Sequence, residues 1–260
     1  MQRQPWFEIH DQPWFPAFLR DQVTEALEAV WNANRTYAPV APLLRDAIRQ
    51  SGADRVVDLC SGGGGPWFTL YPQIAAELAS PRPLRVSLTD LYPSRKLLAR
   101  AGALPNIAAL AEPVDARCVP AALHGFRTIF SSFHHFDPAA ASAILADAFH
   151  RREGIAVFEG ARCSPSTLAA VIGVPLLALR AAAAARPLSG PRLFFTFLVP
   201  VVPAVLWIDG LLSCLRSYSL RDLRDLTQDL RAPDYQWTIG EVRRGIVVIR
   251  YLIGVPIHTS

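Results

Sequence analysis

The chain has 260 residues, of which 51% are hydrophobic, and it carries a formal net charge of +4. This length suffices for one well-packed core with room for an additional segment, and the mean hydropathy of +0.22 is high for a soluble enzyme. Lys96 is the only lysine, and the arginines are scattered without a basic run, which argues against a nucleic-acid-binding surface. The N-terminus lacks a basic-then-apolar signal pattern, so export is not expected.

The four cysteines are Cys60, Cys118, Cys163 and Cys214, and none of them lies in a C-x-x-C pair. We therefore expect them to be reduced and buried in a cytoplasmic protein. Without metal-ligand spacing we expect no zinc site and no other metal site.

The first 52 residues are predicted to be mostly helical. Apolar residues recur at helical spacing between Phe18 and Val30, and a second amphipathic helix is expected over 39–50 with Gly52 as its C-cap. Residues 6–16 are dense in aromatic side chains and could form either a lid or additional core.

Beyond Gly52, short apolar runs alternate with helical segments. We predict strands over 55–59, 84–89, 107–113, 128–131 and 154–158, and helices over 66–78, 93–101, 120–124 and 138–151. Alternation of this kind predicts an α/β fold, with parallel strands and helices on both faces of the sheet.

The pattern changes after residue 159. Residues 164–212 are very apolar and are interrupted by several prolines. A helix is then expected over 219–230, where Ser219 and Asp222 give a capping-box-like start. Two strands, over 235–242 and 246–253, are expected to close the chain as a hairpin.

Three interpretations of residues 161–216 remain open. Two apolar stretches approach the length of a membrane span, but Pro175 and Arg180 interrupt the first and the second is short. The segment could form two membrane spans, an interfacial element that contacts a membrane surface, or a buried lid or homodimer interface. An apolar lid would imply an apolar small-molecule substrate, because a pocket matches the surface that it desolvates.

The segment 56–66 contains an apolar run, Asp58, four consecutive glycines and a proline. This order predicts a strand, a tight turn and the start of a helix, where the backbone can approach a ligand closely and free N–H groups are available. The segment resembles motif I of the class I S-adenosylmethionine (SAM) methyltransferases, an acid-x-G-x-G-x-G loop. Cys60 stands at the family's first glycine, and Gly62 and Gly64 stand at the second and third.

The resemblance implies SAM as the cofactor and assigns its contacts. Asp58 would support the loop and the ammonium group of SAM, and Asp90 would accept both ribose hydroxyls. Leu91 would pack on the adenine, whose amino edge would be read by Asp115 and Ala116. The implied cofactor-binding residues are Asp58, Cys60, Ser61, Gly62, Gly63, Gly64, Asp90, Leu91, Asp115, Ala116, Ser131 and Ser132.

Residues 131–136 resemble the motif that follows the fourth strand in small-molecule methyltransferases. Its His134 and His135, together with Glu159 after the fifth strand, are the candidate catalytic residues, although capping or pocket-lining roles stay open. Because a sulfonium already activates its methyl group, we expect catalysis mainly by proximity and orientation, without one indispensable base. The predicted substrate-pocket residues are Trp14, Tyr37 and Trp67.

These features predict one domain with a Rossmann-like class I methyltransferase fold and a mostly parallel seven-stranded sheet. We divide it into a helical lid segment (1–52), a SAM-binding core (53–160), an apolar helical insertion between strands 5 and 6 (161–216), and a C-terminal helix and hairpin (217–260). The predicted function is methyl transfer from SAM to a small lipophilic acceptor. The alternatives are a nucleotide-binding oxidoreductase, whose G-x-G-x-x-G fingerprint this loop lacks, and a non-catalytic membrane or assembly factor.

Overall fold

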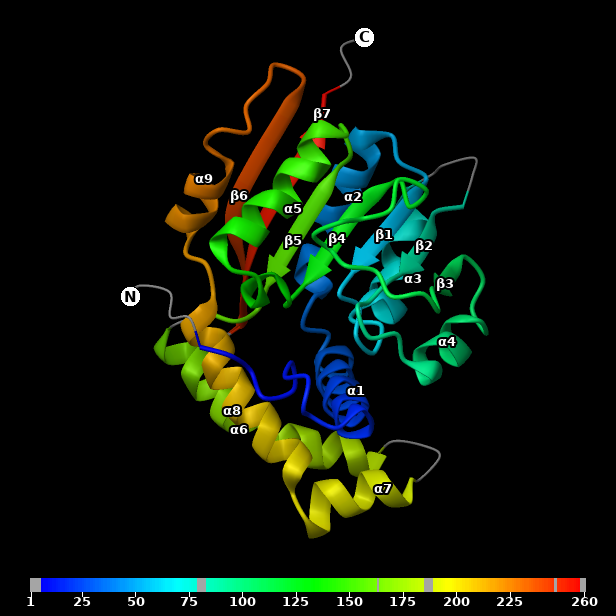
Figure 1. Cartoon of the computed structure of the whole chain (residues 1–260), viewed down its shortest axis with the longest axis vertical. Helices are drawn as coiled ribbons and strands as arrows, with labels where there is room; N and C mark the ends of the chain where they lie inside the picture. The colour runs from blue at the N-terminus through cyan, green and yellow to red at the C-terminus, as the bar shows by residue number, and fades with distance from the viewer. Residues whose placement is uncertain (1–5, 79–82, 163, 185–188, 246, 258–260) are drawn as a thin grey trace.

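The computed structural model describes residues 6–78, 83–162, 164–184, 189–245 and 247–257. Its centre is a seven-stranded sheet with the strand order β3-β2-β1-β4-β5-β7-β6 (Figure 1). The strands are β1 Arg55–Leu59, β2 Arg85–Leu88, β3 Ile107–Ala109, β4 Phe126–Phe130, β5 Ile155–Glu159, β6 Tyr235–Arg244 and β7 Val247–Pro256. Strands β1 to β5 are parallel, whereas β7 is antiparallel to both β5 and β6. The sheet is therefore mixed rather than mostly parallel, because the predicted terminal hairpin adds two strands to its edge.

Helices cover both faces of the sheet and its carboxyl edge. They are α1 Ala17–Ala33, α2 Ala41–Ser51, α3 Trp67–Glu77, α4 Arg95–Ala101, α5 Pro138–His150, α6 Pro165–Ala184, α7 Gly190–Leu193, α8 Val201–Arg216 and α9 Leu220–Thr227, with the short turns η1 Ala38–Val40, η2 Phe133–His135 and η3 Phe194–Leu198. Helices α2, α3 and α4 contribute to the core on one face, and α5 and α9 to the core on the other. Val56 packs into the first core and its neighbour Val57 into the second, as side-chain alternation in a strand requires.

Local sequence signals explain most element boundaries. Gly52 ends α2 in the left-handed conformation, with φ of 67°, and Ser219 opens α9 with a complete capping box to Asp222. The helix expected over 120–124 was wrong: this stretch forms a turn, in which Leu123 N donates to Pro120 O. Gly125, with φ of 146°, follows this stretch directly and β4 begins at Phe126, so only a single turn fits before the strand.

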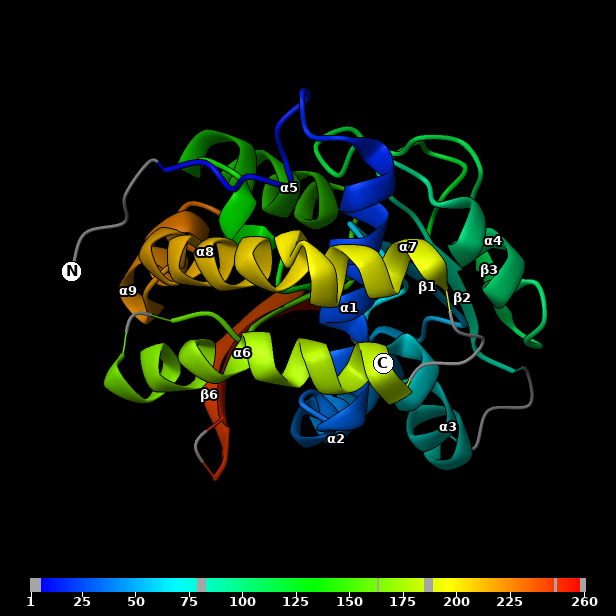
Figure 2. The same cartoon turned by 90° about the horizontal axis from the view of Figure 1, so that it is seen from below.

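Two helices of the apolar insertion lie side by side under the carboxyl ends of the strands. Figure 2, which views the molecule from below, shows α6 and α8 crossing this end together, with α1 behind them. Ala178 of α6 and Val202 of α8 are buried in one apolar cluster with Val23 of α1. The insertion therefore closes the end of the sheet at which α/β proteins bind ligands.

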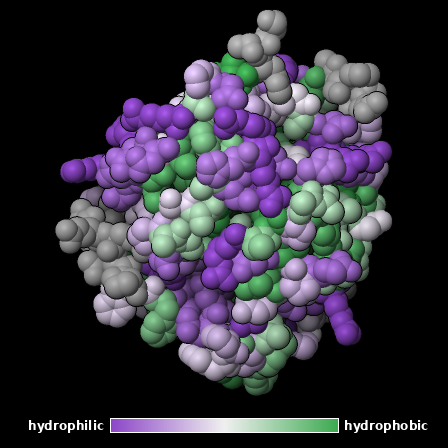
Figure 3. All heavy atoms as spheres, turned by 45° about the horizontal axis from the view of Figure 1, so that its top comes forward, coloured by the Kyte–Doolittle hydropathy of each residue, from purple (hydrophilic) through white to green (hydrophobic). Residues whose placement is uncertain are grey.

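The outer side of the insertion presents apolar side chains to solvent. Ile172 is 67% exposed, Leu176 61% and Leu198 72%. Thr167–Ala184 is long and apolar enough to cross a membrane, with only 17% of it buried, and the bent pair of Gly190–Leu198 and Val201–Arg216 passes the same test as one broken span. By contrast, hydrophilic residues are spread widely over the surface in Figure 3, which turns the top of Figure 1 toward the viewer.

The cysteines differ from the expectation that all are buried. Cys60, Cys118 and Cys214 are free thiols, but only Cys214 is fully buried. Cys118 is exposed because it lies in the loop after β3, and Cys60 is half-buried in the loop after β1. Cys163 lies outside the described residues.

Candidate functional site

The glycine-rich loop after β1 turns sharply toward α3. Cys60 and Gly62 have φ angles of 58° and 54°, and Gly64 has φ of 109°. A Cβ atom at Gly64 would lie 2.3 Å from the ring of Phe68, so this position has no space for a side chain. Cys60 adopts the left-handed conformation without being glycine, and such strained positions are concentrated at functional sites.

Helix α1 covers the outer side of this loop. A Cβ atom at Gly63 would lie 3.2 Å from Glu28 Oε2, and Asn32 Nδ2 donates to Gly65 O at 3.3 Å. Glu28 in turn accepts from Arg100 of α4 with both of its oxygens at 2.7 Å. The loop is therefore held between β1 and α1, a contact that sequence analysis did not predict.

Asp58 is buried beneath the loop and bonded to two hydroxyl groups. Ser61 Oγ donates to Asp58 Oδ2, and Thr128 Oγ1 donates to Asp58 Oδ1, both at 2.6 Å. Burial raises the pKa of Asp58 to about 7, although these hydrogen bonds oppose the rise. Asp58 thus fixes the start of the loop against the neighbouring strand β4.

Asp90 joins the loop to the end of β2. Its Oδ2 accepts from Gly62 N at 2.7 Å and its Oδ1 from Tyr92 N at 2.8 Å. Burial raises the pKa of Asp90, while these two backbone hydrogen bonds lower it. Next to it, Leu91 is 45% exposed. Asp90, the residue expected to accept the ribose hydroxyls, is thus hydrogen-bonded directly to the glycine-rich loop.

Asp115 lies near Asp90 but is engaged by an arginine. Val114 N donates to Asp90 O at 2.9 Å, which brings the segment after β3 next to the end of β2. Both oxygens of Asp115 accept from the exposed Arg117, and the distance from Arg117 Nη2 to Asp115 Oδ2 is 2.6 Å. These hydrogen bonds lower the pKa of Asp115. Ala116, which follows Asp115, is buried.

A cavity of about 780 Å³ lies between the carboxyl ends of the strands and the insertion. Its floor is formed by the glycine-rich loop and the end of β4, and its walls by α1, α6 and α8. The α6 wall is apolar and includes Ala170, Gly173, Val174 and Leu177. Pockets of this volume hold small molecules, and the wall suits an apolar one.

Ser131 at the end of β4 connects the cavity floor to Tyr37. Ser131 has φ of 44°, its Oγ is hydrogen-bonded to the Tyr37 hydroxyl, and it accepts from Gly160 N at 3.2 Å. Burial raises the pKa of Tyr37, so its hydroxyl stays neutral. A second strained residue thus borders the same cavity as Cys60.

His134 occupies a fully buried position between two carboxylates. Its Nδ1 lies 2.7 Å from Glu159 Oε2, and its Nε2 lies 3.1 Å from Glu8 Oε1. Burial would lower the pKa of His134, but the charges of Glu159 and Glu8 raise it to about 10. Glu159 also accepts from Phe133 N at 2.7 Å, so it holds η2 as well as the imidazole.

His135 and His10 extend this network along the N-terminal segment. His135 Nδ1 is hydrogen-bonded to Asp11 Oδ2, and its Nε2 lies 3.7 Å from Glu8 Oε2. His10 Nδ1 lies 2.7 Å from Asp209 Oδ2 of α8, and hydrogen bonding to Asp209 raises the pKa of His10 against the effect of burial. Segment 8–11 is therefore fixed between η2 and α8.

Sequence analysis did not predict the roles of Glu8, His10, Asp11 and Asp209. Two signals were available: three ionisable residues within four positions of an aromatic-rich segment, and a single acid in the long apolar stretch that forms α8. Instead, a pocket role was predicted for the aromatic residue Trp14. Trp6, Phe7 and Trp14 prove to be 56–67% exposed, whereas Glu8 is 2% exposed.

The structure brings about half of the predicted site residues to the cavity. Those that border it are Tyr37, Asp58, Cys60, Ser61, Gly62, Gly63, Ser131, Ser132, His134 and His135. Trp67 is fully buried beside Phe130, with ring centroids 6.2 Å apart, and Trp14 faces solvent, so neither borders this cavity. Glu159 lies behind His134, and the residues of the β2 and β3 ends lie beside the cavity rather than in its wall.

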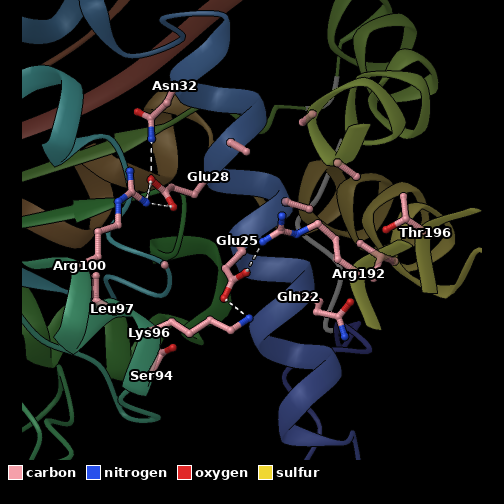
Figure 4. Close-up of a pocket in the computed structure, with 16 residues that line it drawn as sticks. Gln22, Glu25, Glu28, Asn32, Ser94, Lys96, Leu97, Arg100, Arg192 and Thr196 are labelled. Atoms are coloured by element: carbon pink, nitrogen blue, oxygen red, sulfur yellow. Dashed lines mark hydrogen bonds and ion pairs between the residues drawn. The ribbon is translucent and has the colours of Figure 1, made fainter. Parts of the chain in front are cut away.

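A second, more polar cavity of about 500 Å³ lies on the other side of α1. Figure 4 shows Glu28 between Asn32 and Arg100, and Glu25 between Lys96 and Arg192. Lys96 Nζ lies 2.8 Å from Glu25 Oε1. Because these charges are paired with one another, we interpret the cavity as the junction between α1, α4 and the insertion.

Comparison with known proteins identifies the fold. No family model matches this sequence, and no curated protein matches it. Human N-acetylserotonin methyltransferase in complex with SAM aligns with 97% of this chain and 63% of its own, at 11% identity and a TM-score of 0.52. A SAM-dependent methyltransferase from Aquifex aeolicus covers 90% of this chain and 97% of its own, at 12% identity and a TM-score of 0.47. A putative Zn-dependent alcohol dehydrogenase from Rhodobacter sphaeroides covers 90% of this chain and 98% of its own, at 14% identity and a TM-score of 0.49. The first similarity shows that this chain has a Rossmann-like methyltransferase fold.

Proposed function

We propose that this chain transfers a methyl group from SAM to a small, lipophilic acceptor. One observation carries the proposal: the glycine-rich loop, the carboxylate bonded to it and a cavity of about 780 Å³ meet at the carboxyl ends of the strands. Open α/β sheets bind their ligands at this edge. The fold alone does not imply this activity, so the proposal rests on the groups present at the edge.

The residues at the loop fit SAM. Each oxygen of Asp90 accepts one backbone N–H and keeps a further lone pair, so both can accept ribose hydroxyls. Leu91 offers exposed apolar surface to an adenine ring. Asp115 would accept from the adenine amino group once the exposed Arg117 side chain moves aside. Asp58 would act mainly on the loop, because Ser61 and Thr128 occupy its two oxygens.

Bound SAM supplies a methyl group that its sulfonium already activates. The chain would contribute by holding the acceptor against the loop, in line with the methyl group, and by excluding water under α6 and α8. His135 is the best candidate to remove a proton from an acceptor, since it borders the cavity and its side chain is 20% exposed. His134 also borders the cavity but is paired with Glu159, and these two would act through His135.

An apolar acceptor is supported by the cavity wall that the insertion supplies. Ala170, Gly173 and Leu177 of α6 and Leu206 of α8 line it without charge. Desolvating a polar acceptor against this wall would leave its donors and acceptors without partners, which costs free energy.

We also propose that the outer side of α6 and η3 is an association surface. Ile172, Leu176 and Leu198 are more than half exposed. Large exposed apolar surfaces mark interaction sites. A membrane surface or a second copy of the chain would cover it, and in either case the protein would be cytoplasmic, with peripheral membrane association in the first. The rival function is that of a non-catalytic membrane or assembly factor that retains the fold and uses this surface for binding.

The direct test is a structure of the chain with S-adenosylhomocysteine. The proposal expects the ribose on Asp90 and the sulfur facing the cavity beside Ser131. Density for the ligand elsewhere, or binding only of a nicotinamide dinucleotide at this edge, would contradict it and favour the oxidoreductase alternative.

A further inference from the structure

Seven ionisable side chains meet beside the main cavity, where the N-terminal segment, η2, β5 and α8 come together. They are Glu8, His10, Asp11, His134, His135, Glu159 and Asp209. Methyl transfer by orientation does not require so many buried charges, and burying a charge is costly unless it is paired. The cluster therefore needs an explanation of its own.

Three ligand atoms in this cluster converge. His134, His135 and Glu8 each offer one ligand atom, and these three atoms all lie within 4.8 Å of one another. His134 Nε2 lies 3.1 Å from Glu8 Oε1, and His135 Nε2 lies 3.7 Å from Glu8 Oε2. Ligands bonded to one ion at 2.0–2.2 Å are separated by about 3.0–3.5 Å, so a small side-chain adjustment would bring all three onto a single ion.

The opposite nitrogen of each imidazole is held by a carboxylate. His134 Nδ1 faces Glu159 Oε2 at 2.7 Å, and His135 Nδ1 is hydrogen-bonded to Asp11. Histidines that bind metals are oriented in this way, with the non-ligating N–H on a carboxylate that fixes the ring and its tautomer. Two histidines oriented in this way around one shared carboxylate, Glu8, indicate a transition-metal site more specifically than a cluster of acidic residues does.

The charges of the cluster favour a cation. Glu8, Asp11, Glu159 and Asp209 supply four carboxylates. Two arginines lie beside them: Arg216 Nη1 is 3.9 Å from Glu8 Oε1, and Arg20 Nε donates to His10 O at 2.8 Å. With neutral histidines, the four carboxylates outnumber these two arginines, so the described cluster carries a net negative charge. Protons on the imidazoles or a divalent ion can supply the missing positive charge.

We propose that Glu8, His134 and His135 bind one divalent transition-metal ion at the wall of the main cavity. Two imidazoles and one carboxylate suit Zn²⁺, Fe²⁺, Co²⁺ or Mn²⁺, whereas Mg²⁺ and Ca²⁺ prefer oxygen ligands alone. All three ligands border the cavity, so open coordination positions would face the acceptor. If the proposed methyl transfer holds, the ion would take over the role of His135, which cannot accept a proton while it is a ligand, and would itself favour the deprotonated form of an acceptor oxygen. The cysteine spacing led us to expect no metal site, but that spacing gives no information about a site built from histidine and glutamate.

A second set of ligands, Glu8, His10 and Asp209, shares the same glutamate. We favour the first set because Asp209 already has three partners: its oxygens accept from Ile9 N at 2.7 Å and His10 N at 3.1 Å, and Oδ2 faces His10 Nδ1 at 2.7 Å. A ligand that must first give up three partners binds a metal less readily.

The test is a titration of the untagged, metal-free full chain with Co²⁺ and with Zn²⁺. Co²⁺ absorption in the visible range reports coordination geometry, and elemental analysis after gel filtration reports stoichiometry. We expect one ion per chain, and affinity lowered at least tenfold in Glu8→Gln and in His135→Gln. Asp11→Asn should lower it about 10- to 100-fold through the orientation of His135. His150→Gln, on the exposed side of α5, is the matched control and should bind as the wild type does.

Several outcomes would overturn the site. These are no stoichiometric binding by the wild type, unchanged affinity in both ligand variants, or loss of binding in His10→Gln with retention in His135→Gln. Circular dichroism shows whether each variant folds. If the ligand variants do not fold, X-ray absorption of the Zn²⁺-loaded wild type decides, with two imidazole ligands expected and none contradicting the site. SAM titrated into the metal-free chain tests the proposed function separately, so either claim can fail alone.

Discussion

The backbone N–H of Gly62 donates to Oδ2 of Asp90 across 2.7 Å, so the loop after β1 and the end of β2 form one unit. The second oxygen of Asp90 accepts from Tyr92 N at 2.8 Å, which orients the carboxylate. A ligand held by Asp90 would therefore touch the glycine-rich loop as well. The first prediction follows from this relationship.

Replacing Asp90 by alanine should weaken SAM binding by about 1–3 kcal/mol, or about 5- to 150-fold in Kd, because charge-assisted hydrogen bonds to ribose would be lost. The Gly62 N–H would also lose its partner, which loosens the loop. Asp229→Ala, at an exposed aspartate after α9, is the control. Calorimetry that finds the same Kd in Asp90→Ala and wild type would remove Asp90 from the cofactor site.

Asp58 should make the stability of the fold depend on pH. The pKa of Asp58 is about 7 in the fold, against an ordinary value of 3.8, so between these two pH values the unfolded chain binds fewer protons. The free energy of unfolding should therefore fall as pH rises from about 4 to 7, by up to about 4 kcal/mol from this group. Asp58→Asn should lack this contribution. Urea unfolding at pH 4.5 and pH 7 checks it, and an equal pH dependence in both proteins would contradict the assignment.

Gly173 tests the cavity wall on α6. A Cβ atom there would meet nothing within 4 Å, and Gly173 borders the main cavity. Gly173→Ala should raise the free energy of unfolding by about 0.5–1 kcal/mol, because glycine is unfavourable within a helix. Gly173→Leu should narrow the cavity and raise KM for the acceptor while the SAM Kd stays the same. Arg180→Leu, exposed on the same helix, is the control for steady-state kinetics; an unchanged KM in Gly173→Leu would place the acceptor elsewhere.

The outer apolar face should control association. Ile172 and Leu176, one helical turn apart and 67% and 61% exposed, are the positions to change. The double variant Ile172→Glu, Leu176→Glu should bind anionic liposomes at least tenfold less than wild type, or be monomeric where wild type is dimeric. Flotation and sedimentation velocity distinguish the two cases. A wild type that is monomeric and does not float would argue against both partners.

The core of the fold was predictable because its signals are local. The alternation of apolar runs, the glycines after Asp58 and the capping box at Ser219 each determine a few neighbouring residues. The strand that begins at Arg55 and the helix that begins at Pro138 were predicted at those positions. Positions of side chains relative to distant elements carry no such local signal.

The N-terminal segment illustrates that limit. Its aromatic residues suggested a pocket wall, yet Trp14 faces solvent while Glu8 is buried. Glu8 is inside because His134, 126 positions along the chain, and Ser213 on α8 provide its partners, and neither pairing can be read from nearby residues. The same holds for α1, whose Glu28 packs on Gly63.

The central claim is that this edge of the sheet binds SAM, and isothermal titration calorimetry tests it most directly. The chain would be titrated separately with SAM, with S-adenosylhomocysteine and with NAD under identical conditions. We expect a Kd for SAM or S-adenosylhomocysteine in the micromolar range, about −8 kcal/mol at 1 μM, with NAD at least a hundredfold weaker. Tighter binding of NAD than of SAM, or no binding of either sulfur compound, would contradict the account.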